Sequence, residues 1–391
     1  MLNTAFSPWP SFTQEEADAI SQVLLSNKVN YWTGTQCRDF EKEYAAWVGT
    51  KYAIALANGT LALDVALKAL GVGEGDEVIT TPRTFLASAS SIVTAGAAPV
   101  FADVDLNSQA ITAETIERVL TPKTKAVIVV HLAGMPAEMD AIMALSEKHG
   151  FYVIEDCAQA HGAKYKGRSV GTIGHIGAWS FCQDKIITTG GEGGMVTTND
   201  KDLWSKMWSY KDHGKSFDAI YNREHSPGFR WLHESFGTNW RMTELQAVLG
   251  RIQLTRMPAW TARRQANAAQ IDEAVKDLSV VRRVEVPEYS EHAEYKHYLF
   301  VRPENLANGW TRDRIVETIL DRGVPAYQGS CSEVYLEKAF DNTTWRPKYR
   351  LTNAVELGET SLMFLVHPTL THAEINKTCE VIRRVLLSAQ K

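Results

Sequence analysis

The sequence predicts an α/β protein, with a large domain built on a mainly parallel sheet covered by helices and a smaller C-terminal α+β domain. Three observations lead to this prediction. The chain has 391 residues, more than one hydrophobic core usually supports. Between residues 52 and 199, short apolar runs alternate with stretches of helical periodicity. After residue 260 a long polar helix and a mixed segment follow, so we expect domains at residues 1–260 and 261–391.

The apolar runs of the first domain are typical of buried strands. They are "YAIALAN", "DEVITT", "APVFADV", "KAVIVVHL", "FYVIEDC", "AWSFC" and "GMVTT". Most are continuously apolar, which indicates burial on both faces of a largely parallel sheet. Helical spacing between them, as at residues 61–70 and 139–149, supplies the covering helices. Ligands of such sheets bind at the carboxyl ends of the strands, so functional residues are expected there.

The rest of the chain carries helix signals of its own. One apolar face indicates a helix running toward residue 257; it consists of Leu245, Val248, Leu249 and Ile252. "KHYLFVRP" reads as a strand, and a helix from 311 to 323 ends at a glycine, a common C-terminal stop. Capping boxes predict two further helix starts, at Thr13 with Glu16 and at Thr371 with Glu374.

Composition and charge narrow the class of protein. The chain is 45% hydrophobic and 22% charged, as globular proteins are. Its formal net charge of -5 argues against nucleic acid or an anionic membrane as a partner. No apolar run approaches the ~20 residues of a membrane helix. The N-terminus, "MLNTAFSPWPSF", lacks the features of a signal peptide. Scattered cysteines without CxxC spacing suit a reducing compartment, and we expect a soluble cytoplasmic protein without a metal.

Lys185 stands in an unusual setting for a lysine. It lies between two apolar runs and just before a glycine cluster, in "WSFCQDKIITTGGEGGMV". A surface lysine needs no such setting. An amine that forms an imine must lose its proton near neutral pH, and desolvation lowers the pKa of a lysine. The pattern therefore makes Lys185 a candidate nucleophile.

Two other positions carry a functional and a structural interpretation each. Asp156 follows the apolar run "FYVI"; it either caps a turn or accepts a hydrogen bond from a protonated ligand nitrogen. Gly59 and Thr60 lie between a strand and a helix in "LANGTLALDVALKAL". They form either a turn and an N-cap or an anion site made of free helix amides. An anion site, a strand-end carboxylate and a lysine are together the three anchors of pyridoxal 5'-phosphate.

Across nearly the whole chain the sequence resembles the DegT/DnrJ/EryC1/StrS family of sugar aminotransferases, which belong to the fold-type I pyridoxal phosphate enzymes. The resemblance rests on "NGTLALDVAL", "TPRTFLASAS", "VHLAGMPAEMDAI", "VIEDCAQAHGA", "WSFCQDKIITTGGEGGMV", "GTNWRMTELQAVLG" and "FLVHPTLT". It implies that Lys185 binds the cofactor aldehyde covalently and later moves the proton. It assigns Asp156 to the pyridine nitrogen, Phe85 to a stacking face of the ring, and Gln159 to the ring or its hydroxyl.

The resemblance also implies how the cofactor phosphate is held. Gly59, Thr60 and Ser180 are its ligands within one chain, Ser180 standing five residues before Lys185. Asn239, in "GTNWRM", reaches the phosphate of the neighbouring subunit, so the resemblance implies a homodimer with shared active sites.

The chain departs from the family pattern around the substrate. Ala133 stands where many members carry tyrosine, and His175 where aspartate is usual. After the helix at 311–323 many relatives carry a His-Tyr pair, whereas this chain reads "AYQGSCSEVYLEKAF". Gln328 of that stretch, Arg241 and His213 are the candidate substrate residues. Arg241 is either a carboxylate ligand or part of an ion pair at the dimer interface. A structural role is the preferred interpretation of His213, as it is of His131.

The leading hypothesis is a transaminase that moves an amino group from L-glutamate, leaving 2-oxoglutarate, to a nucleotide-linked keto-deoxy sugar. Family precedent favours C4 of a 4-keto-6-deoxyhexose, in the biosynthesis of surface polysaccharide, lipopolysaccharide included, or of a glycoconjugate. The alternatives are a sugar dehydrase or other pyridoxal phosphate lyase, and a non-catalytic regulator. Lys185 argues against the dehydrase branch, in which histidine replaces it, and the full cofactor set argues against a regulator.

Overall fold

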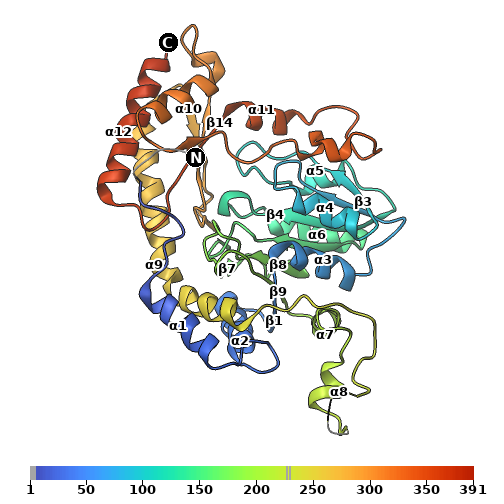
Figure 1. The fold of residues 1–391 in the computed structure, drawn as a ribbon. Helices are drawn as coiled ribbons and strands as arrows, with labels where there is room; N and C mark the ends of the chain where they lie inside the picture. The colour runs from blue at the N-terminus through green and yellow to red at the C-terminus, as the bar shows by residue number, and fades with distance from the viewer. Residues whose placement is uncertain (1–5, 226–227, 229) are drawn as a thin grey trace.

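The computed structural model describes residues 6–225, 228 and 230–391, and its centre is a seven-stranded sheet (Figure 1). The strand order is β1-β9-β8-β5-β4-β2-β3. The strands are β1 (Tyr52–Leu56), β2 (Glu77–Thr80), β3 (Ala98–Phe101), β4 (Thr124–Val130), β5 (Tyr152–Asp156), β8 (Ile176–Ser180) and β9 (Gly194–Thr198). From β3 to β8 every neighbouring pair is parallel, and β9 runs antiparallel to both of its neighbours. The predicted α/β class is confirmed.

Helices cover both faces of this sheet, as continuous apolar strands require. In β4, Ala126, Ile128 and Val130 pack into one core with α3 (Gly59–Ala69), whereas Val127 and Val129 pack into another with α6 (Met139–His149). The other helices of this part are α1 (Gln14–Leu25), α2 (Gln36–Val48), α4 (Ala87–Thr94), α5 (Ala113–Glu117), α7 (Lys201–Tyr210) and α8 (Phe217–Tyr221). The alternation of β4 between two cores explains why its sequence is apolar at every position from Ala126 to Val130.

The C-terminal part holds a second, antiparallel sheet with the order β10-β12-β14-β13. Its strands are β10 (Val281–Arg283), β12 (His297–Val301), β13 (Ala326–Tyr327) and β14 (Ser361–Phe364), and its helices are α10 (Arg312–Asp321), α11 (Thr352–Thr360) and α12 (His372–Ala389). A small third sheet joins β11 (Ser290–Glu291) to β6 (Lys164–Tyr165) and β7 (Arg168–Ser169). Short 3-10 turns lie at Leu132–Gly134, Pro303–Asn305, Val334–Leu336 and Lys338–Phe340. Both predicted capping boxes are present, at α1 and α12.

One long helix, α9 (Glu244–Val275), links the two parts. It contains Pro258 and packs against α1, α2 and α12. Proline removes a helix hydrogen bond and bends a helix, and α9 changes direction between its yellow and gold portions in Figure 1. The sequence indicates two helices here, but the structure has one continuous helix. Residue 260 lies inside it, so a domain boundary at that residue stays a prediction.

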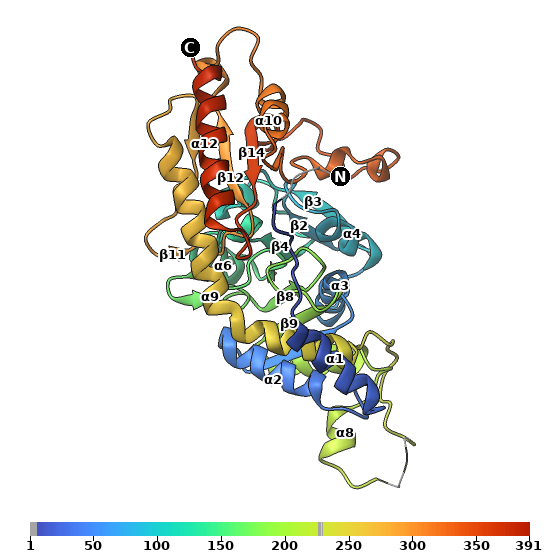
Figure 2. The ribbon, with the colours of Figure 1, turned by 60° about the vertical axis from the view of Figure 1, so that its left-hand side comes forward.

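The N-terminal segment ties the two parts together from outside. It runs from the small sheet toward the large one (Figure 2). Ser7 donates from its hydroxyl to Glu374 at the start of α12, at 3.0 Å. Thr369 donates to the carbonyl of Pro8 at 2.8 Å. The segment is therefore anchored to the C-terminal part before it reaches α1.

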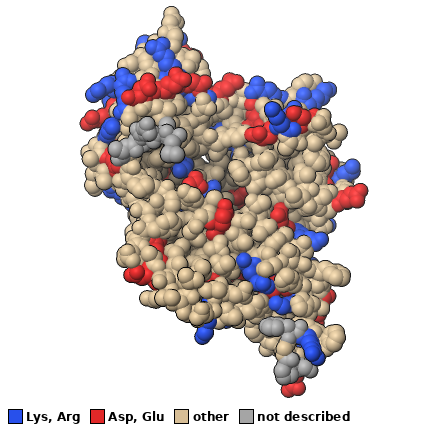
Figure 3. All heavy atoms as spheres, viewed as in Figure 1, with Lys and Arg blue, Asp and Glu red and all other residues tan. Residues whose placement is uncertain are grey.

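The distribution of surface charge and the character of the helices can be compared with the expectation that the protein binds neither nucleic acid nor a membrane. On the face shown in Figure 3, Lys and Arg side chains lie beside Asp and Glu, and most of the surface between these charged side chains is uncharged. Among the described residues, no helix combines the length and the apolar character that crossing a membrane requires.

Candidate active site

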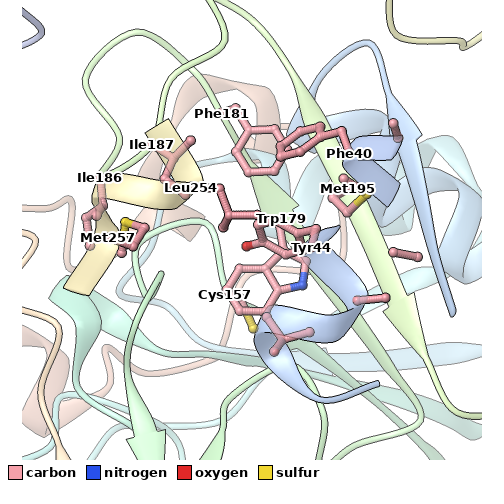
Figure 4. Packing of buried hydrophobic residues seen from close by; sticks show 14 of the residues in the cluster. Phe40, Tyr44, Cys157, Trp179, Phe181, Ile186, Ile187, Met195, Leu254 and Met257 are labelled. Atoms are coloured by element: carbon pink, nitrogen blue, oxygen red, sulfur yellow. The ribbon is translucent and has the colours of Figure 1, made fainter. Parts of the chain in front are cut away.

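Lys185 lies in the loop that connects β8 to β9, and the apolar residues around it anchor that loop. Ile186 and Ile187 are fully buried and pack with Phe181 and Met257 in the core shown in Figure 4. The Lys185 amide donates to the carbonyl of Cys182 at 3.1 Å, and its side chain is half-buried. The apolar runs seen in the sequence therefore hold the backbone, leaving the amine at the carboxyl edge of the sheet.

The glycines after Lys185 allow a backbone conformation and a close backbone contact that a side chain would prevent. Gly191 has a φ of 122°, a conformation that side-chain-bearing residues rarely adopt. At Gly194 a Cβ atom would lie 2.2 Å from the carbonyl oxygen of Asn58. Strand β9 must therefore start with a residue that lacks a side chain, because the backbone that enters α3 passes directly against it.

Asp156 is the last residue of β5 and is 7% exposed. Its carboxylate accepts hydrogen bonds from the Ser88 hydroxyl at 2.8 Å and the Ala158 amide at 3.1 Å. Burial raises the pKa of Asp156, against the effect of these two hydrogen bonds and of the Lys185 charge. A buried carboxylate of this kind is suited to a cationic partner such as a protonated ring nitrogen.

The start of α3 lies against the end of β8. The Asn58 side chain caps α3 by accepting from the Leu61 amide at 3.0 Å. A Cβ atom on Gly59 would lie 2.5 Å from Cβ of Ser180 and 2.9 Å from its hydroxyl oxygen. Gly59 and Ser180 are thus in contact, and Thr60 follows in the first turn of the helix. First-turn amides and a serine hydroxyl together form a cradle for an anion.

The residues expected near the cofactor ring lie at the same edge of the sheet. Phe85, just before α4, is 74% exposed, so a face of its ring is open for stacking. The side-chain oxygen of Gln159 accepts from the Ala133 amide at 2.7 Å. Ala133 has a φ of 57° and is buried. The backbone amide of Ala133 therefore fixes the side chain of Gln159 at this edge of the sheet.

The segment that carries Asn239 and Arg241 runs beside the end of β1. Asn239 is exposed and forms a backbone bridge with Asp212, and the next carbonyl, of Trp240, accepts from the Ala57 amide at 3.0 Å. Arg241 pairs with Asp212 within the same chain, Nη1 to Oδ1, at 2.5 Å. This contact provides an ion pair for Arg241 without a substrate carboxylate.

The other two substrate candidates, His213 and Gln328, form their hydrogen bonds with residues other than Lys185. His213 is exposed, has a φ of 60°, and donates its amide to the carbonyl of Thr238 at 2.8 Å. Gln328 is exposed and donates from its side chain to Asp313 on α10 at 2.8 Å. Nothing in these contacts directs either side chain toward Asp156.

His131 has the contacts of a structural histidine. It is fully buried, its Nδ1 accepts from the Ala137 amide at 3.1 Å, and its Nε2 therefore donates to Glu155 at 3.0 Å. Glu155 also accepts from the amides of Gly171, Ile173 and Gly174. Burial raises the pKa of Glu155, but the His131 hydrogen bond and these amides bring it below its ordinary value. Cys157 completes a group close enough to hold a metal, yet backbone amides already occupy the carboxylate oxygens.

Sequence reasoning did not identify several residues around Lys185. The Tyr295 hydroxyl donates to Asp184, the residue before Lys185, and the Trp9 indole donates to the Lys185 carbonyl at 2.9 Å. Lys296 follows Tyr295, and Ser88 holds Asp156. The position of Asp184 next to Lys185 is the one local signal. Tyr295 and Trp9 lie far away in sequence, and their neighbours indicate a strand and a loop.

The donor set fits pyridoxal phosphate on the observations above. A buried strand-end carboxylate suits the pyridine nitrogen, the Gly59–Ser180 contact suits the phosphate, and the amine of Lys185 suits the aldehyde. A mainly parallel sheet with this set at its carboxyl edge is the arrangement of the fold-type I aminotransferases. Within that class, a sequence model of the DegT/DnrJ/EryC1/StrS aminotransferase family matches residues 10–383, and the chain belongs to this family.

Individual relatives resemble the chain over nearly its full length. The spore coat polysaccharide biosynthesis protein SpsC of Bacillus subtilis is 35% identical over 382 residues, covering 97% of this chain and 96% of the relative. The solved aminotransferase of Psychrobacter cryohalolentis is 65% identical with a TM-score of 0.96, covering 98% of this chain and 99% of the other. DesV of S. venezuelae, solved in complex with a ketimine intermediate, is 29% identical with a TM-score of 0.84, covering 95% and 94%.

Proposed function

We propose that this aminotransferase moves an amino group from L-glutamate, through pyridoxal phosphate, to a nucleotide-linked keto-deoxy sugar. The proposed position is C4 of a 4-keto-6-deoxyhexose. The reaction would be a cytoplasmic step in the biosynthesis of surface polysaccharide, such as lipopolysaccharide, or of a glycoconjugate. The relation to SpsC, whose name places it in polysaccharide biosynthesis, supports this direction.

One observation carries the catalytic part of the proposal. The amine of Lys185, the buried carboxylate of Asp156 and the contact between Gly59 and Ser180 all lie at the carboxyl edge of one sheet. Pyridoxal phosphate, when bound, supplies an aldehyde that captures amino groups and a ring that withdraws electrons from the carbon being deprotonated. Asp156 holds a negative charge against the ring nitrogen. The Lys185 amine would take the proton from the donor carbon and pass it to the carbon of the former aldehyde.

Two hydrogen-bond donors stabilise the negative charge of the buried Asp156 carboxylate. Ser88 and the Ala158 amide each donate to one of its oxygens, which stabilises the carboxylate form. The anion cradle at α3 keeps the phosphate end fixed while the chemistry proceeds at the opposite end. Phe85, whose ring is exposed, would stack on one face of the cofactor ring. These residues position the cofactor, and Lys185 moves the proton.

The proposal includes a homodimer with shared sites. Asn239 is exposed on one chain, close to the end of β1, and is therefore available to a second copy. Trp231 and Phe236, which lie a few positions before Asn239 in the chain, are 90% and 100% exposed. Large apolar side chains at this level of exposure are typical of a surface that another protein covers.

A spectral experiment tests the proposed reaction. The visible absorbance of the cofactor-loaded protein should fall when L-glutamate is added and return when a nucleotide-linked 4-keto-6-deoxyhexose is added. A panel that varies the nucleotide and the keto position then identifies the acceptor. A spectrum unaffected by L-glutamate and by other amino acids would refute transamination, and a spectrum that recovers only with a 3-keto sugar would refute amination at C4.

A further inference from the structure

A short segment of the C-terminal part, residues 293–296, lies at the edge of the large sheet that holds Asp156. The Ala293 amide donates to the carbonyl of Gly134 at 3.0 Å, and the Tyr295 amide donates to that of Ala133 at 2.9 Å. Ala133 in turn donates to Gln159. These backbone contacts fix residues 293–296 against the loop that follows β4, beside the cofactor residues.

Tyr295 places two amines near one ring. Its hydroxyl donates to Asp184, and the ammonium nitrogen of Lys185 lies 5.1 Å from the centre of the ring. The ammonium nitrogen of Lys296 lies 4.8 Å from the same centre. Both amines therefore lie beside one aromatic ring.

Lys296 has a free ammonium group. Over the described part of the chain no hydrogen-bond acceptor or carboxylate pairs with its nitrogen, and its contact is the ring of Tyr295. Burial lowers the pKa of Lys296 to about 8, with the Asp184 charge opposing. The side chain is half-buried and carries a positive charge at neutral pH. A partly desolvated cation without a partner is a favourable place for an anion.

Arg264 adds a second incompletely paired cation at the same place. It is 1% exposed, and one of its nitrogens, Nη1, donates to the Tyr295 carbonyl at 3.4 Å. Its Nε and Nη2 atoms, although buried, have no hydrogen-bond partner among the described residues. An arginine fork with two free donors suits a planar carboxylate. Asp184 attracts Lys185 and Lys296, and Glu294 and Asp184 both attract Arg264, so three cations face two carboxylates here.

We infer that Lys296, supported by Arg264, forms the site that receives a carboxylate of the amino donor. The inference rests on the proposed function, since it specifies where the donor binds. Lys296 and Lys185 contact the same ring, and this proximity favours a carboxylate over the diphosphate of a nucleotide-linked sugar. In an amino acid the carboxylate is bonded to the carbon whose amine reacts, whereas the sugar ring separates the diphosphate from the reacting carbon. A cation that contacts the same aromatic ring as the reactive lysine is therefore placed to bind the carboxylate of the amino donor.

The first test separates the two half-reactions. In Lys296→Met, the L-glutamate concentration needed for half-maximal single-turnover rate should rise roughly 10- to 100-fold, the effect of removing a charged hydrogen-bond partner. The concentration of keto-sugar needed in the second half-reaction should change little. Lys296→Arg should recover most of the loss. Lys68→Met is the matched control, because Lys68 is exposed and lies 5.6 Å from the ring of Tyr210, away from this site.

The second test does not depend on turnover. Glutarate, a dicarboxylate without an amine, should bind the cofactor-free protein in calorimetric titration, and Lys296→Met should lose that binding while thymidine diphosphate binding persists. If glutarate fails to bind the wild type, or binds Lys296→Met as tightly, the inference is wrong. If the variant loses diphosphate binding instead, the ammonium serves the nucleotide and the inference is also wrong. A wild type without any glutamate half-reaction would refute the proposed function instead, and the glutarate titration would still report on the site.

Discussion

The indole nitrogen of Trp9 donates a hydrogen bond of 2.9 Å to the main-chain carbonyl of Lys185. The same indole lies edge-on to Trp260 with ring centres 5.1 Å apart and stacks on His367 at 5.9 Å. The N-terminal segment is thus held by the C-terminal part and fixes the backbone of the lysine that we expect to react. Trp9 is a positioning residue in this arrangement.

Trp9→Phe should loosen the Lys185 loop and leave the rest of the fold intact. Phenylalanine keeps the ring packing but removes the indole donor, a loss of about 1 kcal/mol. Amide hydrogens of residues 182–188 should exchange several-fold faster, as measured by mass spectrometry, and the maximal rate should fall more than the substrate KM changes. Trp260→Phe is the control, since Trp260 contacts the ring of Trp9, and the hydrogen bond to the Lys185 carbonyl comes from Trp9. Equal exchange in the wild type and Trp9→Phe would show that the hydrogen bond does not restrain the loop.

Lys185→Ala should abolish transamination and the visible band of the bound cofactor. Lys296 is a second amine near the site, so the identity of the reacting lysine needs direct proof. Borohydride reduction of the loaded wild type followed by peptide mapping should find the cofactor on Lys185. Recovery of the label on Lys296, or turnover near the wild-type rate in Lys185→Ala, would contradict the assignment.

Asp156→Asn should bind the cofactor but react slowly. The amide keeps the shape of the side chain and removes the charge that keeps the ring nitrogen protonated, so stopped-flow half-reactions with L-glutamate should slow by orders of magnitude. Ser88→Ala removes one hydrogen bond to Asp156 and keeps its charge, and it should slow the reaction roughly tenfold. Unchanged rates in Asp156→Asn would show that another residue is the pyridine partner.

Mixing Lys185→Ala with Asn239→Asp should restore activity if the active sites are shared. Each variant alone is expected to be poorly active. Under conditions of subunit exchange, a heterodimer contains one site that combines the intact Lys185 of one chain with the intact Asn239 of the other. Activity approaching that of one wild-type site per dimer is the expected result. Inactive mixtures in which heterodimers are demonstrated by mass would place Asn239 within the site of its own chain.

Two buried histidines, His297 and His161, should make the free energy of unfolding depend on pH. The first lowers it as the pH rises above neutrality, and the second lowers it as the pH falls. His297 is buried between Glu294 at 3.2 Å and Asp272 at 3.3 Å. Burial lowers its pKa, but the two carboxylates raise it to about 10. Because this folded-state pKa lies above the unfolded value of about 6.5, its contribution is complete below pH 6.5 and is lost as the pH rises toward 10. The pKa of His161 is lowered to about 3 by burial and by Lys185, so the unfolded chain binds a proton that the folded chain does not, and stability falls as the pH falls below 6.5.

Urea unfolding across a pH series measures both effects. For one fully buried group the slope is at most about 1.4 kcal/mol per pH unit. His297→Gln should flatten the alkaline side relative to wild type, and His161→Phe the acidic side. Parallel curves for wild type and His297→Gln between pH 7 and 10 would show that the ion pairs of His297 do not shift its pKa.

Local patterns in the sequence were sufficient for the strands of the large sheet and for the places in the fold where the candidate cofactor residues lie. Continuous apolar runs mark strands buried on both faces, and β4 shows why, since its alternate residues enter two different cores. The setting of Lys185 could be recognised because its anchors, Ile186 and Ile187, are adjacent to it in the chain. Asp156, Gly59 and Ser180 lie at strand ends or helix starts, where parallel topology brings them to one edge. Their assignment to cofactor atoms stays a prediction.

Contacts between distant parts of the chain were decided only by the tertiary structure. Tyr295 meets Asp184 across 111 positions, and Trp9 meets Lys185 across 176. Neither pairing has a local signal, because Tyr295 precedes an ordinary strand and Trp9 lies between two prolines. The antiparallel direction of β9 and the continuity of α9 through Pro258 likewise depend on packing partners elsewhere in the chain. Sequence periodicity reports which face of an element is buried, whereas the partner on that face is chosen when the whole chain packs.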